Sequence, residues 1–322
     1  MGKIRQIYLE SFIQRFDKDG IIQYLTSDDF KDLKKEEYVF NNSINVKIHA
    51  FLYFYDGYRE DKIILFCPGI GPGHCQYVRE IELLASRGYL VLTLDYCGCG
   101  ESGGDNLQSV NEPTRDVCDL LKELKNAKID RISDLINYEI LLIGHSLGAY
   151  TALNVINLTD YIKKGVIISG FLNITKEFMG LTRVPVPFIF RSIKKYEDEV
   201  NKEYNHLDNI KYLKNTNDKL LFIHSKDDTL VPFKSSTQYV MKHVKNNNIE
   251  FLLFDNRKHN PNYTLDALSY MNETFVSYNN MVRSGDLETL DDKVNYMKSK
   301  DIFKMTNQDK EVWDRIIKHL EK

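Results

Sequence analysis

The sequence predicts an α/β fold, with about eight strands in one mostly parallel sheet and helices on both of its faces. Two observations predict it. Six short, unbroken apolar runs follow one another along the chain, as is typical of strands buried on both faces of a parallel sheet. Stretches with helical spacing separate several of these runs, which favours alternating strands and helices. These stretches are Tyr77–Arg87, Thr114–Asn126, Leu147–Leu158 and Lys234–Lys245.

The sheet is expected to begin with an antiparallel pair. Apolar residues alternate from Ile44 to Tyr55, which predicts a strand with one covered face and one wetter face. The preceding Tyr38–Phe40, followed by the turn residues Asn41–Ser43, resembles its hairpin partner. The six parallel strands then follow at Ile63–Phe66, Leu90–Leu92, Ile140–Ile143, Val166–Ile168, Leu220–Ile223 and Phe251–Phe254.

Other segments extend this core. Residues 1–37 are predicted to form an N-terminal helical extension, and residues 38–322 a single domain. Within it, a cap insertion at about 170–218, after the sixth strand, is too long for one crossover helix. A helical C-terminal extension is expected from about residue 279. The extensions either pack around the cap or form a contact in a homo-oligomer.

The C-terminal extension carries two helix signals. Thr306–Asp309 resembles a capping box, and apolar residues follow it at helical spacing. An earlier helix is marked by Leu287, Leu290, Val294 and Met297. We therefore expect this segment to be helical and packed.

Composition excludes several classes of protein. Of the 322 residues, 43% are hydrophobic and 28% charged, so the chain is neither disordered nor collagen-like. A net charge of −3 predicts no nucleic-acid partner. No apolar run approaches the roughly 20 residues that span a bilayer, and Met1–Phe16 lacks the apolar core of a signal peptide. With five cysteines and no export signal, we expect free thiols and a cytoplasmic location.

The strongest chemical signal is Gly144-His145-Ser146-Leu147-Gly148. It lies directly after a predicted buried strand and directly before a predicted helix. A sharp strand-to-helix turn needs small residues at both flanks, and it leaves the serine hydroxyl exposed at the carboxyl edge of the sheet. Ser146 is therefore the candidate nucleophile.

A serine hydroxyl needs a base that removes its proton and an acid that orients the base. His259 lies five residues after the last predicted strand, which places it at the same edge of the sheet as Ser146. Asp227 and Asp228 both follow the strand Leu220–Ile223, and the spacing Asp-x-x-Val-Pro selects Asp228. Asp227 is interpreted as a turn or cap residue.

The reaction also needs two backbone donors for a developing oxyanion. One is the amide of Leu147, the residue after the nucleophile. The other is expected from the loop Cys67–Gly73, where Ile70 is the best candidate. Phosphate and dinucleotide sites are not favoured, because this loop has no Lys-Ser/Thr ending and does not complete a G-x-G-x-x-G pattern. Cys97-Gly98-Cys99 has no second ligand pair, so neither a metal nor a cofactor is expected.

From Tyr38 to Tyr278 the chain resembles α/β-hydrolases, in particular the branch of esterases, monoacylglycerol lipases and serine aminopeptidases. The matching residues are the Gly144–Gly148 motif, Asp228–Pro232, His259 and the turn Asp95–Ser102. The resemblance implies an α/β-hydrolase fold with a variable cap between the sixth and seventh strands. The sequence departs from that branch at Pro68, where His is usual, and at Cys97, where Arg is common.

The leading hypothesis is a carboxylic ester hydrolase that acts through a covalent acyl-enzyme. The substrate is expected to be a small-molecule ester with an apolar acyl or aryl part, because Val184–Phe190 in the cap is apolar. Thioesterase and aminopeptidase activity on the same triad remain alternatives, and so does a non-catalytic ligand-binding protein. An aminopeptidase needs an acidic anchor for the free amine, for which the candidates are Glu177, Glu197, Glu199 and Glu203.

Overall fold

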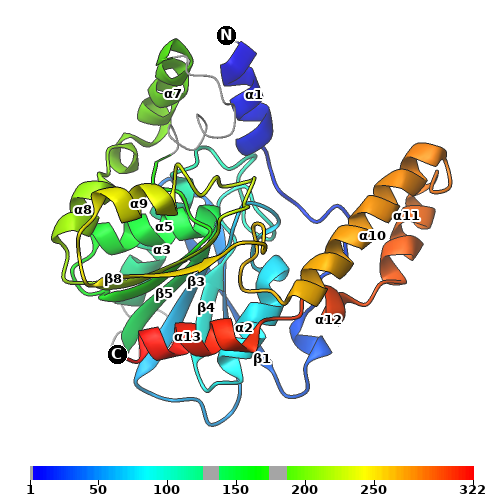
Figure 1. Cartoon of the computed structure of the whole chain (residues 1–322), viewed down its shortest axis with the longest axis horizontal. Helices are drawn as coiled ribbons and strands as arrows, with labels where there is room; N and C mark the ends of the chain where they lie inside the picture. Colours follow the sequence, from blue (N-terminus) through cyan, green and yellow to red (C-terminus); the bar gives the residue numbers. More distant parts are fainter. Residues whose placement is uncertain (1–2, 126–137, 174–186) are drawn as a thin grey trace.

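An eight-stranded sheet crosses the centre of the molecule (Figure 1). The computed structural model describes residues 3–125, 138–173 and 187–322. The strands lie in the order β1-β2-β4-β3-β5-β6-β7-β8. β2 pairs antiparallel with both β1 and β4, and the remaining neighbours pair in parallel. The predicted fold, with an antiparallel start and six mutually parallel strands, is confirmed. The strands are β1 (Lys34–Asn41), β2 (Lys47–Phe54), β3 (Lys62–Cys67), β4 (Leu90–Leu94), β5 (Glu139–His145), β6 (Lys164–Ile168), β7 (Lys219–Ser225) and β8 (Ile249–Phe254).

Helices cover both faces of the sheet (Figure 1). α3 (Glu112–Lys125), α5 (Leu147–Leu158) and α9 (Thr237–His243) bury their apolar sides in one hydrophobic cluster. α2 (Val78–Ala85) and α13 (Lys310–Leu320) lie on the opposite face in a second cluster. Strands β2 to β8 contribute alternate residues to the two clusters, which explains why the parallel strands are apolar throughout, whereas β1 contributes only to the first cluster.

The prediction of a wetter face on β2 is wrong from Ala50 onward. Phe51 and Tyr53 lie on the opposite face of β2 from Ala50 and Leu52, yet each is only 1% exposed. They belong to the hydrophobic cluster that includes α2, and the ring of His74 stacks on Phe51 with centroids 3.8 Å apart. The alternating residues predict only the covered side of the strand, whereas the burial of Phe51 and Tyr53 depends on residues from elsewhere in the chain.

The region predicted as an N-terminal helical extension contains α1 (Lys3–Phe12) and a short 3-10 turn, η1 (Ser27–Asp29). Strand β1 begins at Lys34, inside the range assigned to the extension. A second short 3-10 turn, η2 (Gly73–Tyr77), leads into α2.

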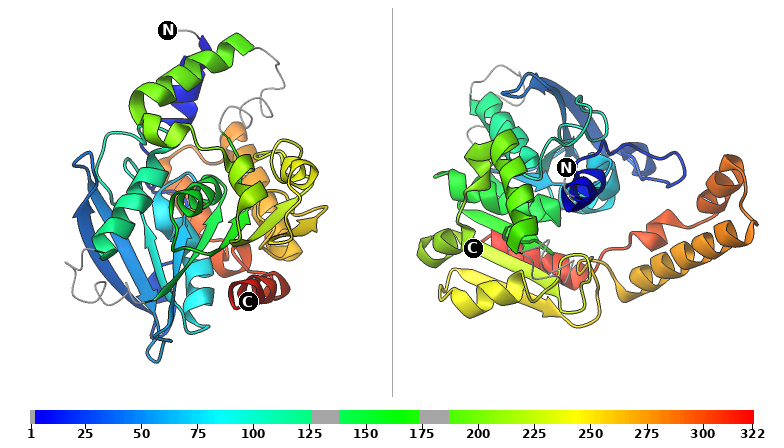
Figure 2. Two further views of the ribbon diagram at one scale, coloured as in Figure 1. Left: turned by 90° about the vertical axis from the view of Figure 1, so that its left-hand side faces the viewer. Right: turned by 90° about the horizontal axis from the view of Figure 1, so that it is seen from above.

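In the described part of the predicted insertion, two helices lie between β6 and β7. They are α7 (Pro187–Asn205) and α8 (Asn209–Asn215). α7 packs against α1, so the N-terminal segment and the cap lie side by side (Figure 2). Of the apolar segment Val184–Phe190, residues 184–186 lie outside the described residues, so the structure supplies no test of a pocket formed by it.

The C-terminal part of the described chain is helical. α10 (Leu265–Ser284) and α11 (Leu290–Lys298) project away from the sheet, and α12 (Ile302–Met305) leads back to α13 (Figure 2). The helix predicted from Leu287 starts at Leu290, because Thr289 and Asp292 form a capping box there. The predicted capping box at Thr306–Asp309 is wrong. Asp309 itself caps α13, since its side chain accepts from the amides of Glu311 and Val312.

No helix in the described ranges is both long and apolar enough to pass through a bilayer.

Candidate active site

Ser146 occupies a strained turn between β5 and α5. Its φ is 56° and its ψ is −121°, a backbone region that residues with side chains rarely adopt. The turn has no room for side chains at its flanking glycines. A Cβ on Gly144 would lie 2.2 Å from the carbonyl oxygen of Gly148, and a Cβ on Gly148 would lie 2.0 Å from that of Cys67. The predicted glycine requirement therefore has a direct steric cause.

His259 and Asp228 meet at the carboxyl ends of the neighbouring strands β7 and β8. The distance between His259 Nδ1 and Asp228 Oδ2 is 2.8 Å. Asp228 Oδ1 accepts from the backbone amides of Leu230 and Val231 at 2.9 and 3.0 Å. The Asp228 side chain is fully buried, so its carboxylate meets protein donors rather than solvent.

Hydrogen bonds to its carboxylate keep Asp228 ionised. Burial by itself would raise the pKa of Asp228, but the hydrogen bonds from His224 and His259 outweigh burial and hold the pKa well below its usual range. His224 lies behind the carboxylate, with Nε2 at 3.3 Å from Asp228 Oδ2 and 2.9 Å from the Val231 carbonyl oxygen. A permanently negative group therefore faces the His259 ring.

Asp227 has a different set of partners. Its carboxylate accepts from Ser225 Oγ at 2.6 Å and from the amide of Lys258 at 3.0 Å. It also pairs with the Lys258 ammonium at 3.0 Å. Asp227 thus holds the backbone just before His259, while Asp228 contacts the ring.

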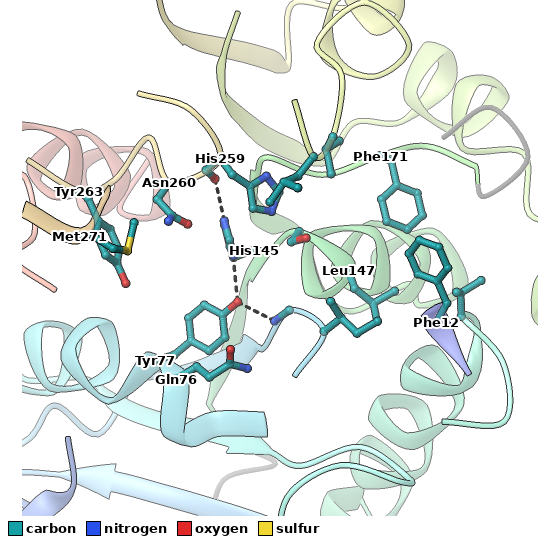
Figure 3. Close-up of a pocket in the computed structure, with 16 residues that line it drawn as sticks. Phe12, Gln76, Tyr77, His145, Leu147, Phe171, His259, Asn260, Tyr263 and Met271 are labelled. Carbon is teal, nitrogen blue, oxygen red and sulfur yellow. Dashed lines mark hydrogen bonds between the residues drawn. The ribbon is translucent and has the colours of Figure 1, made fainter. Parts of the chain in front are cut away.

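Four of the five predicted site residues line one cavity of about 440 Å³, namely Ile70, Ser146, Leu147 and His259 (Figure 3). Asp228 lies behind His259 and does not line it. Much of the remaining wall is apolar. It comes from α1, the loop before α3, the segment after β6, the loop after β7 and α10, through Phe12, Val110, Phe171, Leu230, Val231 and Met271.

Two further residues join the site, and the sequence analysis missed both. The amide of Gly69 donates to Tyr77 Oη at 3.0 Å, and Tyr77 Oη lies 2.9 Å from His145 Nδ1. His145 Nε2 lies 2.9 Å from the carbonyl oxygen of His259 (Figure 3). His145 fills a position of the Gly144–Gly148 motif at which any residue is allowed, and Tyr77 belongs to no motif, so only the fold brings them together.

His145 is neutral in this setting. Burial, with the nearby His259 adding to it, lowers the pKa of His145 to about 3. Its Nε2 faces a carbonyl oxygen, which can only accept, so Nε2 carries the proton and Nδ1 accepts from Tyr77. Tyr77 and His145 are buried, and their polar side-chain atoms are satisfied within this network.

The turn Asp95–Ser102 is a structural support for the loop after β3. Asp95 Oδ1 accepts from the amide and from Nδ1 of His74, both at 2.7 Å. Asp95 Oδ2 accepts from the amide of Glu101 at 2.9 Å. A Cβ on Gly73 would lie 1.9 Å from Asp95 Oδ1, so the loop packs directly on this carboxylate. Cys97 and Cys99 are buried here as free thiols.

The chain matches the family model described as "Prolyl oligopeptidase family" over residues 75–277, which is more than half of its length. No curated protein gives a significant match.

Solved structures with related folds include an esterase from Pyrococcus furiosus, with 20% identity and a TM-score of 0.57 over 76% of this chain and 88% of that one. The uncomplexed acylaminoacyl peptidase of Pyrococcus horikoshii has 19% identity and a TM-score of 0.52, over 72% of this chain and 38% of that one. The esterase domain of a Rhodothermus marinus protein has 18% identity and a TM-score of 0.51, over 71% and 90%. These similarities confirm the predicted α/β-hydrolase fold.

The depressed pKa of His145 has a consequence for stability. An unfolded chain protonates this histidine below its ordinary pKa of about 6.5, whereas the folded chain does not until about pH 3. The stability that His145 contributes is therefore present above about pH 6.5 and declines as the pH falls. We expect the excess stability of the wild type over His145→Gln to shrink by about 2 kcal/mol between pH 7.5 and pH 5. Urea unfolding of both proteins at the two pH values measures it, and an unchanged difference would contradict it.

Proposed function

Because the chain belongs to the prolyl oligopeptidase family, a family of serine hydrolases, we propose that it hydrolyses a carboxylic ester through a covalent acyl-enzyme on Ser146. The proposed triad is Ser146, His259 and Asp228. The observation that carries the proposal is the 2.8 Å bond from His259 Nδ1 to a buried, ionised Asp228, beside a cavity that Ser146 and His259 share. The narrower branch of monoacylglycerol lipases and serine aminopeptidases stays a prediction.

The first half of the proposed reaction forms the acyl-enzyme. Asp228 holds the proton of His259 on Nδ1, which leaves Nε2 free to accept the proton of Ser146 Oγ. The serine oxygen then attacks the ester carbonyl carbon. The imidazolium that forms is stabilised by Asp228, and it returns its proton to the alcohol oxygen as the ester bond breaks. Water releases the acid in the second half, with His259 again acting as the base.

The amides of Ile70 and Leu147 are the proposed oxyanion donors. Leu147 is the first residue of α5, so its amide lies at the positive end of the helix dipole. In the loop after β3, the amide of Gly69 already donates to Tyr77 Oη. The next amide is that of Ile70, which lines the cavity with Ser146. This arrangement supports Ile70 as the second donor.

The cavity favours a small ester with an apolar acyl or aryl part. Phe12, Val110 and Phe171 are among the apolar residues that line it. Burial of an apolar acyl group against these side chains gives binding energy through the hydrophobic effect. Phe12 is a contribution from α1, a segment expected from the sequence only to pack around the cap or to form a contact in a homo-oligomer.

An aminopeptidase would need an acidic anchor in the cavity. Glu197 accepts from Tyr8, Ser109 and Asn111, so its carboxylate is already satisfied by protein donors. Glu199 pairs with Arg5 and Lys195. Neither of these residues nor Glu203 is among those that line the described cavity, and Glu177 lies outside the described residues. We therefore place the ester ahead of the aminoacyl amide, while the thioester stays an alternative on the same triad.

A substrate panel tests this function. We expect p-nitrophenyl butyrate to be hydrolysed with a higher kcat/KM than the matching thioester or leucine p-nitroanilide. Ser146→Ala should lower kcat by about 10⁶-fold, because the triad acts as a unit. Activity of that variant near the wild-type level would exclude Ser146 as the nucleophile. A wild type that binds the ester without hydrolysing it would favour the non-catalytic alternative, and a preference for the anilide would favour the aminopeptidase.

The two adjacent aspartates provide a matched pair. Asp228→Asn places an amide donor against His259 Nδ1 and favours the wrong tautomer, so we expect kcat to fall by about 10⁴-fold. Asp227→Asn keeps a carbonyl acceptor for the Lys258 amide, and kcat should stay within about tenfold of the wild type. Steady-state kinetics on p-nitrophenyl butyrate measure both. An equal loss in the two variants would contradict the assignment of Asp228.

A further inference from the structure

A single chain of hydrogen bonds connects the backbone of Gly69 with the backbone of His259. It runs from the amide of Gly69 to Tyr77 Oη, from the Tyr77 hydroxyl to His145 Nδ1, and from His145 Nε2 to the carbonyl oxygen of His259 (Figure 3). Its three distances are 3.0, 2.9 and 2.9 Å.

The direction of this chain is fixed at both ends. The Gly69 amide can only donate and the His259 carbonyl can only accept. His145 therefore carries a proton on Nε2. In the neutral ring Nδ1 is an acceptor, so Tyr77 accepts from Gly69 and donates to His145. A protonated His145 would leave the Tyr77 hydroxyl without an acceptor in this chain. Burial favours the neutral form, since Tyr77 and His145 are 9% and 6% exposed.

This chain of hydrogen bonds connects loops that follow strands which are not neighbours in the sheet. Gly69 follows β3 and His259 follows β8, and three strands separate β3 from β8 in the sheet. His145 belongs to the strained turn between them. The loop that carries Ile70, the turn that carries Ser146 and the loop that carries His259 are thus connected directly through side chains.

The connection also has close steric limits. A Cβ on Gly69 would lie 2.5 Å from Tyr77 Oη and 3.3 Å from the Cβ of Ser146. The Gly69 backbone is therefore in close contact with both the hydroxyl and the nucleophile. A displacement of Tyr77 would let this loop move relative to Ser146.

We propose that Tyr77 and His145 are positioning residues. They hold the loop that carries Ile70 and the loop that carries His259 at the correct distances from Ser146. This inference rests on the proposed function of the triad. Neither side chain needs to touch the reacting atoms. Their effect is transmitted through Gly69 to the adjacent amide of Ile70, and through the His259 backbone to its ring.

Such a role predicts a specific kinetic pattern. An oxyanion donor acts on charge that develops only in the transition state, so its misplacement lowers kcat more than it raises KM. A neutral His145 also matters for the base, because its ring centroid lies 4.8 Å from that of His259. A positive charge there would oppose the imidazolium that His259 must become.

The test compares Tyr77→Phe, His145→Gln and the double variant on p-nitrophenyl butyrate. Each single variant should lower kcat by about 10- to 100-fold, with KM within about threefold of the wild type. Affinity for phenylboronic acid, which forms a tetrahedral adduct on a serine, should fall by the same factor. The kcat of the double variant should be only slightly lower than that of the less active single variant, because each change breaks the same chain of hydrogen bonds.

Tyr212→Phe serves as the control. It removes a tyrosine hydroxyl that donates to Asp218 at 2.7 Å outside the cavity, so kcat should not change. A kcat for Tyr77→Phe within threefold of the wild type, additive losses, or a loss confined to KM would each overturn the proposal. If one single variant fails to fold, the other carries the same comparison.

A second measurement does not depend on activity. Nitrogen-15 NMR of histidine-labelled wild type, assigned with His145→Gln, should show His145 neutral and protonated on Nε2 from pH 5 to 8. A proton on Nδ1 or a charged ring would overturn the chain. If the tautomer is as expected but the wild type hydrolyses no ester and does not bind phenylboronic acid, the proposed ester hydrolysis fails and not the hydrogen-bond chain.

Discussion

The left-handed backbone of Ser146 is the constraint on which the whole site depends. A φ of 56° is unfavourable for a serine, and the turn persists because the packing around it admits no other arrangement. Gly148 packs against the carbonyl oxygens of Cys67 and Pro68, so there is no room for even a methyl group between the turn and the loop after β3. That contact packs the turn that carries Ser146 and Leu147 against the loop that carries Ile70. The proposed nucleophile and the two proposed oxyanion donors therefore belong to segments that one packing contact joins.

His259 is held in place by a different set of contacts. The loop that carries it is anchored on one side by Asp227 and Asp228, and on the other by the C-terminal segment. The amide of Asp309 donates to the carbonyl of Asn262 at 2.8 Å, and the amide of Thr264 donates to that of Asn307 at 3.1 Å. Arg257 pairs with Asp309 at 2.7 Å. The start of α13 thus fixes the backbone on both sides of His259, which gives the C-terminal segment a structural connection to the site.

Sequence patterns predicted what depends on local order. The apolar runs, the glycines around Ser146 and the position of His259 after the last strand each reflect a nearby steric or burial requirement, and the fold that follows from them is confirmed. Patterns could not predict contacts between distant segments. Phe12 reaches the cavity only because α1 packs beside the cap. Tyr77 and His145 are 68 residues apart in the sequence, and only the fold brings them into contact. The buried side of β2 was missed for a related reason, since what covers Phe51 and Tyr53 comes from elsewhere in the chain.

Reaction of the intact protein with a fluorophosphonate probe tests the central claim most directly. This reagent phosphonylates a serine, with loss of fluoride, only when the nucleophile, the base and the oxyanion donors are in place together. Intact mass and peptide mapping should show one adduct, on Ser146, in the folded protein and none after heat denaturation. Absence of an adduct on the folded protein, or an adduct on another residue, would contradict the account of Ser146 as an activated nucleophile.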